Sequence, residues 1–287
     1  MARDTYLSGI VAAHRAAAAA DTRRLADLQA RAADAPAPRG FAARLSGHAA
    51  SGGLSVIAEI KRRSPSKGDI DPGLDPAALA AEYEAGGASC LSVLTDAEYF
   101  GAIPDDLEVA RASCALPVLR KDFTVSEADV YDARIMGADA VLLIVAALDD
   151  HELSALHAAA VGVGLDALVE VHDAGELERA LEIGAVSVGV NQRDLHSFTV
   201  DRRRALSLAG AIPQEVVAVA ESGIDGAREA AVLAAAGYQA VLVGESLLRA
   251  GDRRAAVSAL RGHPVGRRVA AAAAGSASAG PGGVGRG

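Results

Sequence analysis

Short apolar runs recur along the chain at intervals of about 20 to 35 residues, and this repetition restricts the fold more than any other feature. Each run is too short for a core helix and too apolar for an exposed strand. That combination is typical of parallel strands that are covered on both faces. The runs span residues 54–60, 90–94, 116–119, 140–145, 167–171, 186–190, 216–220 and 240–243.

The segments between these runs carry the signals of helix ends. Asp75 precedes a proline at a first helical position, and Ser126 is followed three residues later by Asp129, as in a capping box. Further N-caps are expected at Asp149, Asp173, Asp201 and Asp225, and glycines at 86–87, 137, 184 and 237 are expected to end helices.

Eight strand–helix units in a row predict either a closed barrel or a doubly wound open sheet. No G-x-G-x-x-G motif follows the first run, which weakens the dinucleotide-binding version of the open sheet. The near-equal units favour an α/β fold of the (β/α)8 TIM-barrel type. We expect one domain over residues 1–262, including a helical extension over about 1–50 that packs under or across the barrel. The Gly- and Ala-rich stretch 263–287 is expected to be a flexible, disordered tail.

Charge and composition exclude several classes of function. The formal net charge of −9 argues against a nucleic-acid partner, and no apolar run of about 18 residues is present to span a membrane. Cys90 and Cys114 have no metal-ligand spacing and are interpreted as free thiols of a reducing, cytoplasmic protein. The histidines form no recognisable ligand pair, so no metal is expected. We expect a monomer or a weak homodimer.

Polar residues follow the predicted strands at the point where each strand ends. In a (β/α)8 barrel the chemistry lies at these C-terminal ends. Alternation places Glu59 and Lys61 on one face. Charged side chains inside a narrow mouth are costly unless they are paired or used. We therefore predict a functional cluster, which consists of Glu59, Lys61, Lys121, Glu170, Asn191 and Glu221.

A phosphate site is predicted beside this cluster. Ser222 and Gly223 follow the seventh strand, and Gly244 and Glu245 follow the eighth, where backbone N–H groups of such barrels bind anions. We expect the backbone of Glu245, not its side chain, to face the ligand. The basic, hydroxyl-rich segment 61–68 after the first strand is interpreted as a mobile lid that senses a phosphate or carboxylate, with a solvated charge run as the alternative.

Eight ordered motifs resemble the indole-3-glycerol-phosphate synthase family, from about residue 5 to 262. They lie at 57–68, 92–101, 119–123, 137–144, 168–172, 189–195, 220–224 and 243–247. The resemblance implies a (β/α)8 barrel with an N-terminal helical extension and no cofactor. It also implies a phosphorylated substrate, 1-(2-carboxyphenylamino)-1-deoxyribulose 5-phosphate, whose ring closure, decarboxylation and dehydration belong to tryptophan biosynthesis.

The same resemblance implies roles for individual residues. Lys121 would be the general acid, Glu170 the general base, and Lys61 a second lysine for the phosphate or for dehydration. Glu59 and Asn191 would orient these groups, and Glu221 would bind substrate or hold a lysine. Ser222, Gly223, Gly244 and Glu245 would hold the phosphate, Arg193 and Ser64 would face the carboxylate, and Phe100, Phe123, Leu142, Ile144 and Leu195 would line the slot for the aromatic ring.

A lysine can act as the acid if neighbouring cations and partial burial draw its pKa toward neutrality, and we expect this of the acid lysine. The sequence departs from the family pattern at 101–105 and at Gln192, neither of which is a matched catalytic position.

Other functions on the same fold remain open. They are a Schiff-base aldolase with Lys121 or Lys61 as nucleophile, an isomerase of the same pathway, and a binding or scaffold barrel without turnover. The isomerase is disfavoured because this sequence has no Cys/Asp acid–base pair at the ends of its first and sixth strands, and the intact polar cluster argues against the scaffold.

Overall fold

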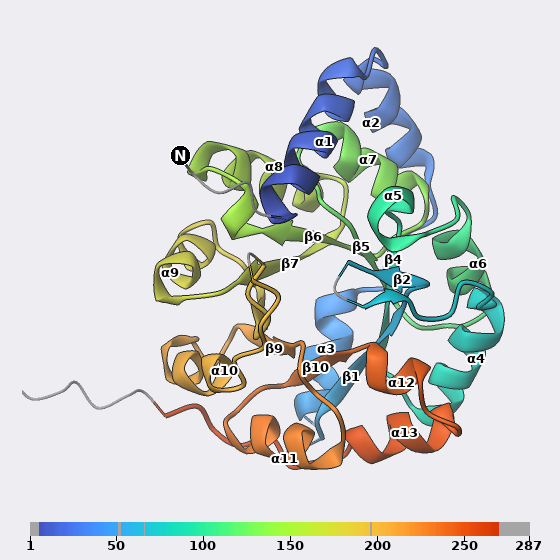
Figure 1. Cartoon of the computed structure of the whole chain (residues 1–287). Helices are drawn as coiled ribbons and strands as arrows, with labels where there is room; N and C mark the ends of the chain where they lie inside the picture. The colour runs from blue at the N-terminus through green and yellow to red at the C-terminus, as the bar shows by residue number, and fades with distance from the viewer. Residues whose placement is uncertain (1–5, 51–52, 66, 196, 270–287) are drawn as a thin grey trace, which may run out of the picture.

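A computed structural model describes residues 6–50, 53–65, 67–195 and 197–269. Eight parallel strands close into a barrel in the order β1-β10-β9-β8-β7-β6-β5-β4, with β4 pairing back to β1 (Figure 1). The predicted closed barrel is therefore confirmed, and the open sheet is excluded. The strands are β1 (Ser55–Ile60), β4 (Cys90–Leu94), β5 (Val118–Lys121), β6 (Ala140–Ile144), β7 (Asp166–Val171), β8 (Ser187–Asn191), β9 (Val217–Glu221) and β10 (Ala240–Val243).

A ring of helices surrounds the strands. Its members are α4 (Pro76–Gly86), α6 (Asp106–Ala112), α7 (Glu127–Ile135), α8 (Asp150–Gly162), α9 (Ala174–Glu182), α10 (Arg203–Leu208), α11 (Ala227–Ala235) and α13 (Arg253–Leu260), with short α5 (Ala97–Phe100) and α12 (Glu245–Leu248) near the mouth. Asp75, Ser126, Asp149 and Asp173 cap their helices as expected.

Two of the expected N-caps are wrong. Asp201 accepts a hydrogen bond from the Arg203 backbone N–H but lies one residue before the N-cap position of α10. Asp225 instead forms an ion pair with Arg202, and Gly226 takes the N-cap position of α11, which has no side-chain cap. A carboxylate near the start of a helix can bind other groups than the backbone N–H, and the Asp225 carboxylate binds the surface residue Arg202.

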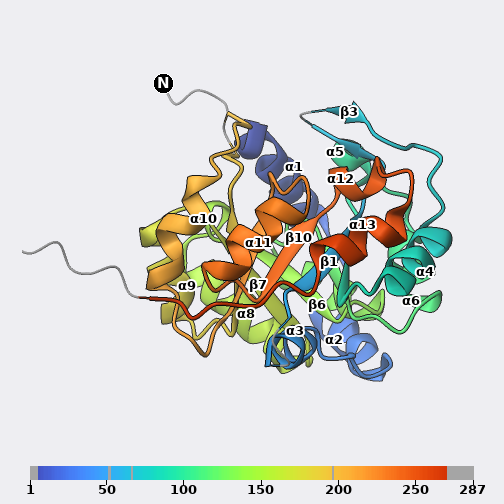
Figure 2. The same cartoon turned by 90° about the horizontal axis from the view of Figure 1, so that it is seen from below.

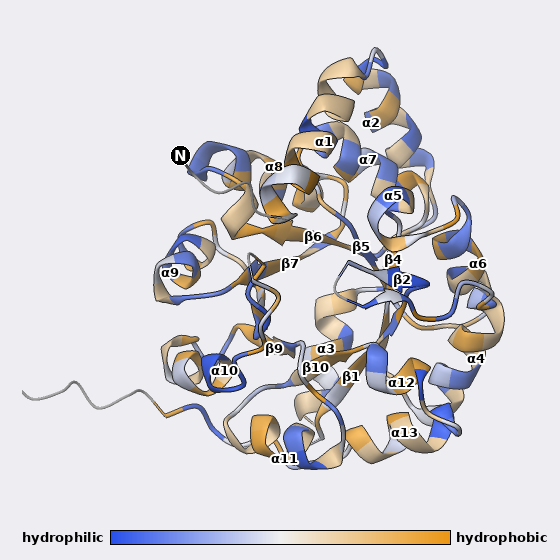
Figure 3. Ribbon diagram, in the orientation of Figure 1, coloured by the Kyte–Doolittle hydropathy of each residue, from blue (hydrophilic) through white to orange (hydrophobic). Residues whose placement is uncertain are grey.

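The strands divide the apolar core into two layers. Inside the barrel, residues such as Ile57, Leu119 and Leu168 form one fully buried cluster. Their neighbours on the other face, among them Val56 and Ile60, pack against the ring of helices. Figure 3 shows apolar residues along the strands and polar residues on the outer helix surfaces and around the mouth. This alternation is why only every second strand residue can serve the interior.

The N-terminal extension reaches both ends of the barrel. It comprises α1 (Tyr6–Ala20), α2 (Leu25–Asp34) and α3 (Phe41–Ala50). From α3, Phe41 and Leu45 are fully buried against the inside cluster at the N-terminal ends of the strands. Figure 2 shows α3 at the end of the barrel opposite β3 (Gly68–Asp69), which belongs to the loop after β1, whereas α1 rises toward the mouth. The extension therefore packs both under the barrel, through α3, and across its mouth, through α1.

The barrel domain does not end at residue 262 as expected. Pro264 forms an antiparallel bridge with Gly53, and the Arg268 side chain is buried. Its guanidinium donates to the carbonyls of Ile212, Pro213, Val216 and Gly237 at the starts of β9 and β10. Residues 263–269 are therefore part of the packed structure, and the remainder of the expected tail, 270–287, lies outside the described residues.

The segment after β1 folds into a small antiparallel hairpin, β2 (Arg63–Ser64) and β3 (Gly68–Asp69). Arg62 is buried and holds this loop, because its guanidinium contacts both carboxylate oxygens of Asp106 at 2.7 and 3.0 Å. The basic character of the segment is thus partly structural. Ser66 lies outside the described residues. No helix in the described part of the chain is long and apolar enough to cross a membrane.

Candidate active site

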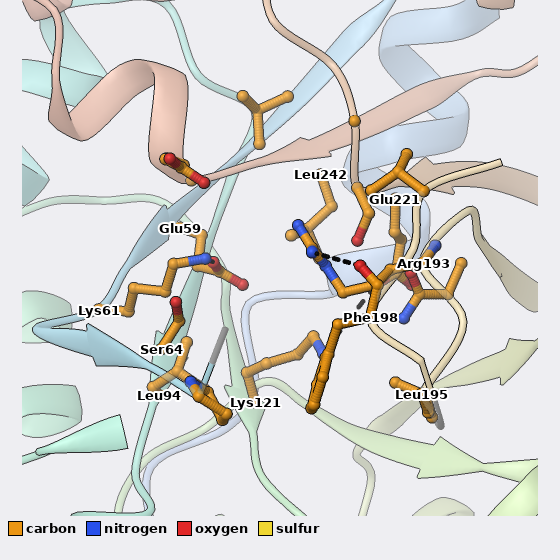
Figure 4. Close-up of a pocket in the computed structure, with 18 of the residues that line it drawn as sticks. Glu59, Lys61, Ser64, Leu94, Lys121, Arg193, Leu195, Phe198, Glu221 and Leu242 are labelled. Atoms are coloured by element: carbon orange, nitrogen blue, oxygen red, sulfur yellow. Dashed lines mark hydrogen bonds and ion pairs between the residues drawn. The ribbon is translucent and has the colours of Figure 1, made fainter. Parts of the chain in front are cut away.

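A cavity of about 800 Å³ opens at the C-terminal ends of the strands. Every residue predicted from the sequence for catalysis or binding lines it. In Figure 4, Glu59 and Lys61 approach from one side, Lys121 from below, and Arg193, Leu195 and Phe198 from the other side. The predicted lining residues are Glu59, Lys61, Ser64, Phe100, Lys121, Phe123, Leu142, Ile144, Glu170, Asn191, Arg193, Leu195, Glu221, Ser222, Gly223, Gly244 and Glu245.

Glu59 and Lys61 form an ion pair at the end of β1. The Lys61 Nζ lies 2.6 Å from Glu59 Oε1, and both side chains are largely buried. Gly244 makes room for this pair, because a Cβ at that position would collide with the Glu59 carboxylate. The sequence predicts a glycine at 244 because a bound phosphate needs close approach to the backbone. The structure shows that the neighbouring Glu59 carboxylate also requires a residue without a side chain there.

Lys121 lies between carboxylates. Its Nζ is 3.4 Å from Glu170 Oε2 and 4.0 Å from Glu221 Oε2. Burial alone would lower the pKa of Lys121, but the negative charges of Glu170, Glu221 and Glu59 outweigh it and raise that pKa above its usual range. The expectation of a pKa drawn toward neutrality is wrong, because the cluster surrounds this lysine with anions and not with cations. Lys121 is therefore an ammonium ion.

Glu170 and Glu221 are neighbouring carboxyl groups with opposite shifts. Burial favours the neutral form of both. For Glu170 this is outweighed by Lys121, His172 and the hydrogen bond from Asn191, so its pKa is lowered. Glu221 is buried and faces the charge of Glu170, so its pKa is raised well above the ordinary value. The pKa values of these two neighbouring groups are thus shifted in opposite directions, which is typical of acid–base sites.

Two residues of β8 fix these carboxyl groups. The Asn191 Nδ2 donates to Glu170 Oε1 at 3.1 Å, and its Oδ1 accepts from the Arg193 backbone N–H at 3.0 Å. Gly189 leaves room for Glu221, since a Cβ there would collide with its Oε1. The strand therefore orients Glu170 through an amide and leaves room for Glu221 through a missing side chain.

The loop after β8 carries Arg193 into the site. Its Nη1 donates to the Phe198 carbonyl at 3.1 Å, and its backbone bridges to Val200 (Figure 4). These contacts hold a guanidinium beside the cavity, and among the described residues its other N–H groups have no acceptor within hydrogen-bond distance.

The neighbouring part of the rim follows β9 and β10. Ser222 and Gly223 both have left-handed conformations, with φ of 66° and 68°. The Gln192 side chain supports this turn by donating to the Ser222 carbonyl at 2.8 Å. The Glu245 carboxylate lies 3.3 Å from Arg249 and 4.0 Å from Lys67, so cations of the rim neutralise it. Small residues and backbone N–H groups at this rim suit an anion.

The sequence did not identify all of the apolar wall. Leu7 and Ile10 of α1 line the cavity together with Leu94 and Leu242 from the strands. The three-residue spacing of Leu7 and Ile10 on a helix indicates a buried face, but no local pattern predicts which surface that face covers. Phe198, also in the wall, adopts a left-handed conformation with φ of 57°.

One group in the described part of the chain has the composition of a metal site, namely His14, Asp96 and Asp122. The His14 Nε2 lies 2.9 Å from Asp96 Oδ2 and 3.9 Å from Asp122 Oδ1. Asp122 also accepts hydrogen bonds from the side chains of Arg120 and Thr95. Both oxygens of Asp122 therefore have protein partners already, since Oδ1 accepts the Phe123 backbone N–H, and the group is better described as a contact that fastens α1.

Comparison with known proteins gives a consistent result. Residues 7–260 match the family model described as indole-3-glycerol phosphate synthase. A protein of Rhizorhabdus wittichii with that name is 52% identical over 235 residues, which are 82% of this chain and 89% of the relative. A thiamine phosphate pyrophosphorylase from Pyrococcus furiosus superposes with a TM-score of 0.54 at 17% identity, covering 72% of this chain and 93% of that one. That likeness concerns the fold alone.

Proposed function

The chain belongs to the indole-3-glycerol phosphate synthase family, and from this we propose how the cavity at the mouth of the barrel carries out the reaction. The enzyme is a carboxy-lyase of tryptophan biosynthesis. It converts 1-(2-carboxyphenylamino)-1-deoxyribulose 5-phosphate to indole-3-glycerol phosphate by ring closure, decarboxylation and dehydration.

Lys121 serves as the general acid of ring closure. As the aromatic carbon attacks the ketone, the carbonyl oxygen becomes an alkoxide, which is basic enough to take a proton from an ammonium ion. The carboxylates around Lys121 keep it in this charged form. A positioned acid of this kind contributes about 10²–10⁴-fold in rate.

Glu170 serves as the general base that later removes a proton from carbon. Its carboxylate form is favoured by Lys121 and by the Asn191 amide. The raised pKa of Glu221 favours its protonated form, which can donate a hydrogen bond to a substrate oxygen. The observation that carries the proposal is the geometry around Lys121, whose Nζ lies 3.4 Å from Glu170 Oε2 and 4.0 Å from Glu221 Oε2.

The other residues position the substrate. The backbone of 222–223 and 244–245 receives the phosphate, and Lys61, oriented by Glu59, assists the phosphate or the loss of water. Arg193 and Ser64 face the carboxylate, while Phe100, Phe123, Leu142, Ile144 and Leu195 hold the aromatic ring. Pinning both ends of the substrate brings the two reacting carbons together, which supplies much of the remaining acceleration.

The assay uses the absence of tryptophan from the chain. An indole product fluoresces against a background from tyrosine only. We expect wild-type protein to give rising indole emission and Lys121→Ala to lower kcat by about 10²–10⁴-fold. Arg228→Ala is the control, because it removes a cationic side chain from an exposed position on α11, outside the cavity. Its kcat should stay near the wild-type value.

Two outcomes would contradict the proposal at different levels. No emission from wild-type protein at high enzyme concentration would remove the activity. Equal rates for wild type and Lys121→Ala would remove only the role of that lysine. Borohydride treatment with substrate present tests the aldolase, which needs an uncharged amine to form a Schiff base. The raised pKa of Lys121 argues against such an adduct.

We further propose that the protein works in the cytoplasm as a monomer or a weak homodimer. Cys90 is buried and Cys114 half-buried, and both are free thiols, as a reducing compartment allows. Sedimentation velocity over a range of concentrations would test the oligomeric state.

A further inference from the structure

His172 lies behind the carboxylate of Glu170 and does not itself line the cavity. It follows the end of β7 and is two residues from Glu170, so both side chains leave the chain on the same side. Its Nε2 is 3.7 Å from Glu170 Oε1, the oxygen that also accepts from Asn191. The imidazole is therefore placed to act on the substrate only through Glu170.

The other ring nitrogen is fixed by a second carboxylate. The Nδ1 of His172 lies 3.0 Å from Glu176 Oε2, which also accepts the His172 backbone N–H at 2.7 Å. Glu176 is in the first turn of α9, where the Asp173 side chain accepts its backbone N–H. The ring therefore sits between two carboxylates, one inside the barrel and one near the surface.

Whether the contact between His172 and Glu170 is attractive depends on whether the imidazole is protonated. In a neutral ring with Nδ1–H donating to Glu176, the Nε2 lone pair would face an anionic oxygen. The Nε2 is buried, and within the described parts of the chain it has no hydrogen-bond partner. Only the imidazolium makes both contacts favourable.

Charged groups from three elements face this ring. Burial and the charge of Arg204 on α10 lower the pKa of His172, but Glu176 on α9 and Glu170 on β7 raise it overall. Glu170 thus has a cation on each side, since Lys121 approaches its other oxygen. Burial beside Glu221 favours the neutral form of Glu170. Without His172, fewer positive charges would oppose that effect.

We propose that His172, as an imidazolium, is a positioning residue that keeps Glu170 ionised and fixed for its role as the base. This inference rests on the role given to Glu170 above. It assigns to His172 no contact with substrate. It also gives Glu176 a function, which is to hold the ring and its charge in place.

The test is the pH profile of indole formation by His172→Gln. Loss of the imidazolium makes Glu170 easier to protonate, so the acid limb of the kcat profile should move to higher pH. We expect kcat at pH 6 to fall about tenfold relative to wild type, to recover within about twofold at pH 9, and KM to stay within about twofold. The recovery at high pH is the result that a purely structural role would not produce.

Two further variants keep the inference testable if His172→Gln folds poorly. Glu176→Gln removes the charge that holds the ring, so it should shift the acid limb in the same direction by a smaller amount. Glu178→Gln is the matched control, since it makes the same change at an exposed position on the same helix. Its profile should superimpose on that of wild type.

Superimposed profiles for His172→Gln and wild type would overturn the inference, as would a loss of rate that is equal at all pH values. Thermal melting of each variant separates such a uniform loss from unfolding. An inactive wild-type enzyme would instead contradict the proposed function, so the two failures are distinguishable.

Discussion

The two ends of the barrel differ in how their buried charges are satisfied. At the N-terminal ends of the strands, the buried Asp139 carboxylate accepts the backbone N–H groups of Arg39 and Val118, both at 2.7 Å, and contacts Arg111 at 3.0 Å. At the mouth, Glu221 is equally buried, yet its Oε1 has no hydrogen-bond partner among the residues described.

The N-terminal extension shows the same difference. At the closed end, Phe41 and Leu45 fill the barrel as a plug, and both are fully buried. At the mouth, Leu7 and Ile10 cover one wall and leave a cavity beside it. The closed end therefore combines a filled interior with a buried carboxylate that accepts three hydrogen bonds. The other keeps unsatisfied groups and empty volume, which cost stability and are typical of functional sites.

The largest effect on stability should come from Phe41→Ala at the closed end. Removing a fully buried aromatic ring leaves a cavity, so the free energy of unfolding should fall by about 3–5 kcal/mol. Below the melting temperature, kcat and KM should not change. Chemical denaturation and the indole assay measure the two properties.

Phe123→Ala is the matched substitution at the mouth. Phe123 is half-buried in the cavity wall, so this variant should lose less stability and raise KM. If Phe41→Ala changed KM and Phe123→Ala did not, the two ends would not be separable in this way.

A smaller effect, confined to the mouth, is expected for Gly189→Ala. The added Cβ would displace the Glu221 carboxylate, and a catalytic group misplaced by about 1 Å can cost about 10²-fold in rate. Stability should fall by only about 1–3 kcal/mol, as for other overpacked cores. Gly162→Ala is the control, because a Cβ there meets open space. An active Gly189→Ala with wild-type kcat would show that the position of Glu221 is unimportant.

The smallest effect is expected for His14→Gln, which loosens α1 at the mouth. The hydrogen bond to Asp96 raises the pKa of His14, so the charged pair stabilises the protein below the unfolded-state pKa of histidine. This contribution should be about 1 kcal/mol or less and should fade as the pH rises through the raised pKa. The difference in unfolding free energy between wild type and variant should therefore be larger at pH 6 than at pH 9.

His157→Gln is a control for the direction in which stability changes with pH. Burial lowers the pKa of His157, so its effect on stability should change with pH in the opposite direction. Parallel trends for the two histidines would show that the contact of His14 with Asp96 does not control the stability of α1.

The sequence was sufficient for the strands and for the residues at their ends. Runs such as Ala240–Val243 carry their own signal in the apolar pattern, and a closed parallel barrel places all strand ends at one rim. Glu59, Lys121, Glu170 and Glu221 could therefore be assigned to one cavity before any distances were known.

The features that the sequence did not predict depend on contacts between distant segments. The raised pKa of Lys121 follows from three carboxylates on three other strands, and a list of strand ends does not say which charges surround which. Leu7 and Ile10 have a helical spacing that fits many surfaces. Arg268 lies in a stretch of low complexity, so its sequence context does not predict burial. Its guanidinium nevertheless donates to backbone carbonyls at the starts of two strands.

The bridge between Gly53 and Pro264 bears on how this enzyme can be attached to other molecules. The chain enters the first strand and leaves the last helix side by side, at the face opposite the mouth. Arg268 then keeps the following residues on that face. A fusion partner, tag or solid support joined after residue 269 would be anchored at the closed end, which leaves the mouth free for substrate to enter and product to leave.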